Sequence, residues 1–356
     1  MVRTTRKHRG RRSLRNPGSL RRILQHGGAG GIPKIIHQIW FGSPVPELRK
    51  PLFAFNEEVA KRNGYAYKLW VEEDRIAKRV KDMGNGKTKN VSVHFEVTTD
   101  YQDTAIKAGE ETEQNRMAQV ADLARIEILY NHGGIYIDSL IEISDEFIEA
   151  IEIASEKGAT FIGANEDPCD LDCEGGNGKK YLTNSFFATN KYNGVLERLL
   201  DFGRLDAIDF ENQYINQTTG PYYLRSGIED PKADKVFLFK SDQIFPFREQ
   251  ETRYQPAVRD VCLFTEDGEG RMKIKEAKGT APALYLKQKC LEGRQAEFIA
   301  RRVTELKHEQ EAANETASKR LQKIIDSANT NPTEFIVSQR GPLAIYHSGL
   351  GGTWSW

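Results

Sequence analysis

The segment from Met117 to Ile143 constrains the fold more than any other part of this chain. Its first half, MAQVADLARIEILYNH, carries apolar residues around most of its circumference at helical spacing, which predicts a helix buried between two layers. Two glycines follow, and then an apolar run ending at Asp138 predicts a short buried strand. Because a buried helix that leads directly into a buried strand is a building unit of α/β sheets, the segment predicts an α/β protein.

Further apolar and helical segments alternate along the chain. Strands are predicted at residues 32–42, 65–70, 159–165, 185–189 and 236–239, and helices at 52–62 and 195–202. The polar, glycine-containing stretch 81–115 predicts an insertion over the site or a mobile loop, and the charged stretch 283–328 predicts one or two exposed helices. We therefore expect one domain over residues 32–356, with a mixed sheet, helices on both of its faces, and mostly helical additions toward the C-terminus.

Residues 1–31 form a basic segment of different composition. No acid precedes Glu47, and the basic residues are Arg3, Arg6, Lys7, Arg9, Arg11, Arg12, Arg15, Arg21 and Arg22. A disordered tail is the expectation, and a targeting segment or a polybasic contact with a membrane surface, an acidic partner or nucleic acid stays open. The formal net charge of +0 argues against attraction of the whole molecule to nucleic acid or anionic membrane.

Several protein classes lack support in the sequence. It contains no apolar run long enough to span a bilayer, so we expect a soluble or peripheral protein and favour the cytoplasm. Cys169 and Cys173 have no second Cys/His pair with which to build a zinc site. The motifs of P-loop, Rossmann and serine-hydrolase enzymes are absent, which argues against those classes.

Three places carry residues suited to chemistry. Asp138 ends a predicted buried strand, at the edge where open α/β sheets bind ligands. Asp122 and Arg125 stand at i and i+3 on the buried helix, where charged groups need strong partners and could bind sugar hydroxyls. The glycine-rich HSGLGGTW, which starts at His347, could close as a flexible loop over a diphosphate.

Four segments together resemble a known family. IPKIIHQIWFG, ADLARIEILYNHGGIYID, TTGP and YHSGLGGTW stand in the order found in glycosyltransferases with an Asp-x-Asp sugar-binding region. That family includes yeast-type mannosyltransferases, bacterial capsule enzymes and catalytic domains of large clostridial toxins. The resemblance implies a GT-A-type nucleotide-sugar-binding fold. It also implies a retaining hexosyltransferase that uses a UDP- or GDP-sugar, a glycan, protein or other hydroxyl acceptor, and Mn²⁺ or Mg²⁺.

The resemblance also assigns roles to particular residues. Catalytic roles are assigned to Asp122, Arg125 and Asp138, and metal binding to Asp138 and His347. Nucleotide-sugar binding is assigned to Ile39, Trp40, Asp122, Arg125, Tyr136, Asp138, Thr353 and Trp354. In this assignment Trp40 lies beside the nucleotide base and the Asp122–Arg125 pair holds the donor sugar.

Leu140 departs from the family pattern, because a second aspartate is expected at that position. Leucine offers no lone pair to a metal ion. Three outcomes follow: the ion is held by Asp138, His347, the diphosphate and water; Glu142 substitutes for the missing aspartate; or the protein binds the donor with little or no turnover. The alternative to a transferase is therefore a catalytically weakened nucleotide-sugar-binding pseudoenzyme. A nucleic-acid-binding protein is a third hypothesis, which rests on the basic tail alone.

Overall fold

The computed structural model describes residues 31–46, 49–83, 86–112, 115–166, 181–211, 214–240, 243, 264–266, 272–274 and 281–346. Its centre is a six-stranded sheet with the order β2-β1-β5-β8-β7-β9. These strands are β1 Ile35–Trp40, β2 Ala66–Val71, β5 Gly134–Ile137, β7 Phe161–Glu166, β8 Tyr181–Thr189 and β9 Val236–Phe239. Strand β1 runs parallel to β2 and β5, β7 runs parallel to β9, and β8 is antiparallel to both of its neighbours. The expected mixed sheet is confirmed.

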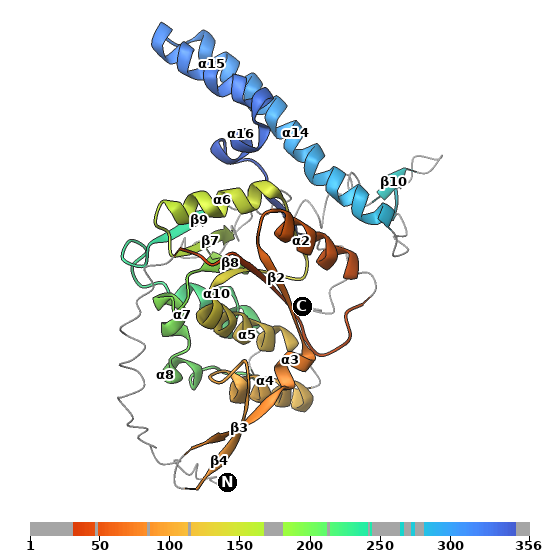
Figure 1. The fold of residues 1–356 in the computed structure, drawn as a ribbon, viewed down its shortest axis with the longest axis vertical. Coiled ribbons are helices and arrows are strands. Elements are labelled where there is room, and N and C mark those ends of the chain that lie inside the picture. The colour runs from red at the N-terminus through yellow and green to blue at the C-terminus, as the bar shows by residue number, and fades with distance from the viewer. Residues whose placement is uncertain are drawn as a thin grey trace, which may run out of the picture.

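Helices cover both faces of this sheet (Figure 1). One face packs against α4 (Thr99–Thr112), α5 (Met117–His132), α7 (Gly194–Leu199) and α10 (Pro221–Ser226). The other face packs against α2 (Lys50–Arg62) and α6 (Asp145–Glu156). Helix α5 is buried without a break from Gln119 to Leu129, which confirms the layer position that its sequence predicts.

The segment expected to be an insertion over the site or a mobile loop is largely regular, which argues against the mobile loop. It forms the hairpin β3 (Lys78–Asp82) and β4 (Thr88–Ser92), and then α4. The Glu127 carboxylate of α5 accepts hydrogen bonds from the Val97 and Thr98 amides at 2.9 and 2.8 Å, just before α4 begins. Because these donors attach the start of α4 to α5, the segment is ordered despite its polar composition.

Short elements connect these layers. They are α3 Glu72–Ile76, β6 Ile141–Ile143, α8 Phe202–Leu205, α9 Ile215–Thr218, β10 Phe264–Glu266 and β11 Met272–Ile274. Strands β10 and β11 form a two-stranded ladder of their own.

The C-terminal part is helical, as its charge pattern predicts. Helices α14 (Ala281–Glu311) and α15 (Glu315–Thr330) lie side by side and extend away from the sheet, and α16 (Pro332–Ser338) follows (Figure 1). The chain then returns as β12 (Ala344–Tyr346), which pairs antiparallel with β6 and sets Tyr346 opposite Ile141. The C-terminal strand therefore lies beside the turn that follows β5.

Two further expectations fall partly outside the described residues. The boundary between a basic tail and a domain starting at residue 32 stays a prediction, because residues 1–30 are not among those described. Within the described part of the chain, no helix is both long and apolar enough to cross a bilayer.

Candidate active site

Strands β1 and β5 end at the same edge of the sheet. They are parallel, with Ile36 opposite Ile135 and His37 opposite Tyr136, so Trp40 and Asp138 both stand at or just beyond the strand ends. The antiparallel β8 begins at this edge, where the Asp138 amide donates to Ser185 O at 2.7 Å. Carboxyl ends of parallel strands are where α/β sheets bind ligands, which makes this edge the candidate site.

Asp122 and Arg125 form a buried ion pair on the helix beneath that edge. Arg125 Nη2 lies 2.9 Å from Asp122 Oδ1, and the two side chains are 6% and 5% exposed. A surface pair between i and i+3 would contribute a few tenths of a kcal/mol, roughly 0.2–0.5. Burial changes this, because each charge has lost its water and now requires protein partners.

The partners of Asp122 come from two distant segments. Asn184 of β8 donates from Nδ2 to Oδ1 at 2.8 Å, and the Thr219 hydroxyl donates to Oδ2 at 2.8 Å. Among the described residues, Oδ2 accepts from Thr219 alone, although a carboxylate oxygen has two lone pairs. Thr219 and Asn184 therefore hold the carboxylate in one orientation.

Arg125 joins the helix to the sheet. Its Nη1 donates to Asn184 O, its Nε lies 3.3 Å from Ala121 O, and its guanidinium lies 4.5 Å from the centre of the Tyr136 ring. A planar guanidinium suits this combination of carboxylate, carbonyl and aromatic face, which an ammonium group could not satisfy in the same way.

Burial is the main influence on the Asp122 carboxyl. Desolvation raises its pKa, while the Arg125 charge and the hydrogen bonds from Thr219 and Asn184 oppose this effect. The nearby Asp138 charge raises the pKa further, and Asn184, which donates to Asp122, directly precedes Ser185, whose carbonyl accepts from the Asp138 amide.

Asp138 is half-buried and begins a tight turn. Its Oδ1 accepts from the Ser139 amide at 2.8 Å, and its carbonyl accepts from the Ile141 amide at 3.0 Å. The turn thus contains Ser139 and Leu140 as its central residues. The Leu140 side chain is 5% exposed, so the position where the family pattern expects an aspartate points into the protein.

Three further residues predicted to bind the nucleotide sugar are buried. Ile39 and Tyr136 are buried in the layer that contains α5. Trp40 stands at the expected edge, but its ring is 4% exposed, with Phe53 at 6.3 Å and the Arg49 guanidinium at 5.9 Å. Stacking a base on Trp40 therefore requires a group that now covers the ring to move.

Some predicted residues cannot be compared with the geometry. His347, Thr353 and Trp354 lie outside the described residues, which end at Tyr346 of β12.

Glu142, the proposed substitute for the missing aspartate, is 1% exposed within β6 and pairs with Ile345. It lies beyond the turn rather than in it.

The structure adds two residues to the predicted site, Asn184 and Thr219. Thr219 belongs to the TTGP segment, whose resemblance to the family was a usable signal, although no role was assigned to it. No feature of the sequence pointed to Asn184, since single polar residues are common in strands.

The described residues offer a divalent ion one carboxylate at the strand edge. They contain no group of three or more His, Cys, Asp or Glu side chains that could hold a metal. Asp138 offers one carboxylate at the strand edge, and Mg²⁺ and Mn²⁺ sites in phosphate-binding proteins commonly use one or two carboxylates with phosphate oxygens and water.

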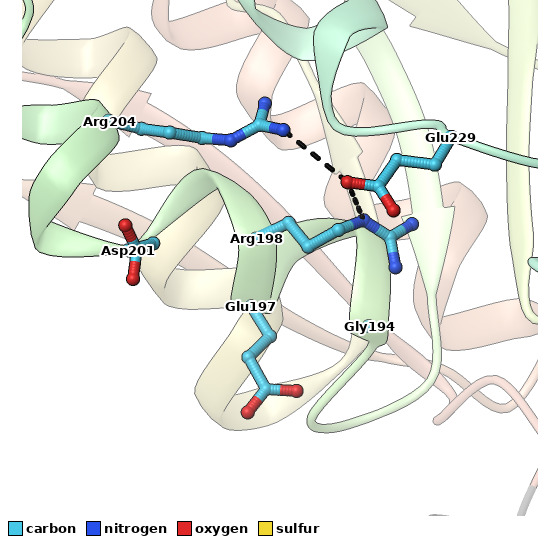
Figure 2. A pocket seen from close by; sticks show the side chains of 6 residues that line it. All are labelled: Gly194, Glu197, Arg198, Asp201, Arg204 and Glu229. Carbon is cyan, nitrogen blue, oxygen red and sulfur yellow. Dashed lines mark ion pairs between the residues drawn. The ribbon is translucent and has the colours of Figure 1, made fainter.

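A surface hollow lies elsewhere on the molecule (Figure 2). Its lining residues are Gly194, Glu197, Arg198, Asp201, Arg204 and Glu229. Arg198 and Arg204 both pair with Glu229, at 3.8 and 3.6 Å. The hollow involves α7, which follows the end of β8, and that end pairs with Gly134 at the start of β5. It therefore lies toward the opposite edge of the sheet from Asp138.

A family model and several known proteins match parts of this chain. Residues 53–153, which include Asp122, Arg125 and Asp138, match the family model described as "Glycosyltransferase sugar-binding region containing DXD motif". "Subversion of eukaryotic traffic protein A" of Legionella pneumophila subsp. pneumophila is 26% identical over 203 residues, which cover 54% of this chain and 29% of that protein. The chain thus spans less than a third of this relative's length. These findings confirm the resemblance to glycosyltransferases with a DXD sugar-binding region. They also support the prediction that the enzyme class of this chain is glycosyltransferase.

Solved structures resemble the chain more loosely. PaToxG glycosyltransferase has 16% identity and a TM-score of 0.36, with 56% of this chain and 69% of that chain covered. The UDP-bound glycosyltransferase domain of the YGT toxin has 12% identity and a TM-score of 0.36, with coverage of 58% and 79%. The catalytic domain of the Clostridium novyi alpha-toxin has 10% identity and a TM-score of 0.33, with coverage of 61% and 76%. Similarity at this level is too low to transfer a function.

Proposed function

We propose that this chain is a retaining glycosyltransferase that moves a hexose from a UDP- or GDP-sugar to a hydroxyl acceptor. The observation that carries this proposal is the buried Asp122–Arg125 pair, which Asn184 and Thr219 orient beside Asp138. A buried ion pair held by two further polar side chains is costly to assemble, and its orientation toward a strand edge suits the recognition of a polyhydroxylated ligand.

Each residue has a distinct part in the proposed reaction. Asp122 accepts a hydrogen bond from a sugar hydroxyl through Oδ2, and Arg125 holds Asp122 in place. Asp138 and, from its position in the sequence, His347 would hold a Mn²⁺ or Mg²⁺ ion. Such an ion neutralises charge on a leaving diphosphate.

The transfer exchanges one bond at the sugar C1 atom for another. The bond from C1 to the diphosphate oxygen breaks, and the acceptor oxygen bonds to C1 on the same face. The hydroxyl proton leaves to the departing phosphate oxygen or to solvent. We nominate no protein nucleophile, and the main contribution of the chain is to orient the donor.

Leu140 supports a second candidate, a donor-binding protein with little turnover. Its side chain is buried at the position where the family pattern has a metal-binding aspartate. Loss of one carboxylate ligand weakens the hold on the ion, which slows departure of the diphosphate more than it weakens binding of the sugar.

A manganese titration of donor hydrolysis separates the two candidates. UDP-glucose and GDP-mannose serve as probes, and turnover is followed with and without chelator in the wild type and in Asp138→Asn. Asp145→Asn is the matched control, because Asp145 is an exposed acid that pairs with Arg62 at 2.7 Å. Turnover lost with chelator and in Asp138→Asn supports the transferase. Donor binding without turnover in the wild type supports the second candidate, and absence of binding by any nucleotide sugar contradicts both.

The partners and the compartment remain part of this proposal. The acceptor is a glycan, a protein or another hydroxyl compound, the basic tail contacts a membrane surface or an acidic partner, and the cytoplasm is the favoured location. A chain that starts at Ile32 tests the tail. If it keeps every activity of the full chain, a nucleic-acid-binding function based on the tail is wrong.

A further inference from the structure

Two buried amide side chains hold the turn that carries Asp138. Gln38 of β1 and Asn56 of α2 are both 0% exposed. Gln38 Nε2 lies 3.0 Å from Asp138 O, and Asn56 Nδ2 lies 2.7 Å from Ile141 O. The first and last residues of the turn are therefore each bonded to a side chain from a different element.

The neighbours of Gln38 determine which way its amide faces. Its Oε1 accepts from the Tyr67 hydroxyl at 2.6 Å and from Asn56 Nδ2 at 3.3 Å. An oxygen occupies this position, because Asn56 Nδ2 can only donate and the Tyr67 hydroxyl can donate to the same atom, and the nitrogen is left facing the Asp138 carbonyl. The network of Tyr67, Gln38 and Asn56 thus has one consistent hydrogen-bond direction that ends at the turn.

Asn56 bonds β6 as a neighbouring strand would. Its Nδ2 donates to Ile141 O, and its Oδ1 accepts from the Ile143 amide at 3.2 Å. The turn is also closed by its own bond from the Ile141 amide to Asp138 O. The Asp138 amide bonds the turn to β8, and the pairing of β6 with β12 holds its far end, so the two amides add the bonds that hold the turn against β1 and α2.

Burying an amide side chain costs more free energy than burying an apolar side chain of the same size. Each amide loses its hydration on folding, and apolar residues would fill the same space without that loss. Their presence beneath this turn favours a role in fixing the backbone position over a role in filling volume.

We propose that Gln38 and Asn56 are positioning residues that set the direction in which Asp138 presents its carboxylate. This inference rests on the proposed function, since it deepens the part that Asp138 has in holding the donor diphosphate. Neither side chain touches the donor, and both act through the backbone of the turn.

Hydrogen exchange tests the structural half of this inference without any ligand. The double variant Gln38→Met/Tyr67→Phe removes the Gln38 amide together with the Tyr67 hydroxyl that donates to it. No buried hydroxyl is then left unpaired. Gln102→Met is the matched control, because Gln102 is a buried glutamine of α4 that donates to Thr98 at 2.8 Å, away from the turn. We expect exchange at the Ile141 amide to accelerate about tenfold or more in the double variant and to stay unchanged in the control. Unchanged exchange at Ile141 in the double variant overturns the inference.

Donor binding tests the functional half. At a temperature where circular dichroism shows every variant folded, the Kd for UDP-glucose and GDP-mannose with Mn²⁺ should rise about tenfold in Gln38→Met/Tyr67→Phe. Asn56→Leu should give a rise of the same order, and Gln102→Met none. The positioning role is refuted if Asp138→Asn binds the donor weakly while Gln38→Met/Tyr67→Phe and Asn56→Leu bind it normally. If Asp138→Asn binds normally, the proposed function fails instead, and the exchange result still decides whether the amides hold the turn.

Discussion

The Thr219 hydroxyl lies 2.8 Å from Asp122 Oδ2 and joins two segments that are 97 residues apart in the chain. This bond brings the TTGP segment to the charged pair of α5. It also defines one side of the candidate donor site, because Asn184 approaches the other oxygen of the same carboxylate.

Thr219→Val should destabilise the protein and weaken donor binding. The substitution keeps the shape of the side chain but leaves a buried carboxylate oxygen without its donor, at a cost of roughly 1–3 kcal/mol in the free energy of unfolding. Urea denaturation measures this cost. Thr219→Ser, which keeps the hydroxyl, should retain most of the stability. Equal losses in the two variants would mean that the bond contributes nothing.

Leu140→Asp should make the protein less stable and more responsive to manganese. A carboxylate at a position that is 5% exposed loses apolar contacts and hydration, so we expect a loss of roughly 2–4 kcal/mol without metal. Mn²⁺ should restore part of this loss by binding the native state.

The thermal midpoint with and without Mn²⁺ checks the response of this variant. Leu140→Asn is the control, since it is polar and similar in size to aspartate but carries no charge. A midpoint that rises equally with Mn²⁺ in the wild type, Leu140→Asp and Leu140→Asn would show that position 140 does not reach the ion.

His37 should make the protein lose stability in acid. Burial lowers its pKa from 6.5 to about 3, and the ring is held neutral between Gly133 O, at 3.0 Å from Nε2, and Trp70 Nε1, at 3.1 Å from Nδ1. Between these two pKa values the unfolded chain binds a proton that the native state does not, so stability falls as the pH falls.

The contribution of His37 can be isolated by substitution. In His37→Gln the pH dependence of the unfolding free energy between pH 4 and 6 should be smaller by about 1.4 kcal/mol per pH unit. His308→Gln is the control, because the His308 side chain is 75% exposed. If the unfolding free energy of His37→Gln depends on pH as steeply as that of the wild type, His37 titrates normally in the native state.

Gly134→Ala should prevent stable folding. Gly134 has a φ of +97°, and an added Cβ would lie 2.4 Å from Ile35 O on the neighbouring strand. We expect a loss of more than about 3 kcal/mol, since both the backbone conformation and the approach of β1 to β5 exclude a side chain. Gly158→Ala, at a φ of +90° with nothing within 4 Å, should cost only about 1–2 kcal/mol. Similar unfolding midpoints for the two variants would contradict the importance of the close approach.

Much of the fold could be predicted from the sequence, because its signals are local. The apolar circumference of α5, the Gly133–Gly134 turn and the run before Asp138 each depend on neighbours in the chain, and all appear where expected. The alternation of strands and helices likewise predicted a mixed sheet covered on both faces. The resemblance predicted Asp122, Arg125 and Asp138 as site residues, and the structure pairs the first two and links them to Asp138 through Asn184 and Ser185 of β8.

Other features depend on contacts between distant segments, which no local pattern records. Composition predicted an insertion or a mobile loop before α5, whereas Glu127 binds the backbone at the start of α4 and orders that segment. The sequence shows that Leu140 interrupts a motif, but only the packed turn shows that its side chain points inward.

The sequence by itself therefore determined the class of fold and the charged groups of the site. The tertiary structure decided which partners hold those groups, namely Asn184 and Thr219 for Asp122, and Gln38 and Asn56 for the Asp138 turn. The physical reason is the same in each case. A buried polar group must find its hydrogen-bond partners in space, and those partners come from whichever segments the packing of the layers brings close.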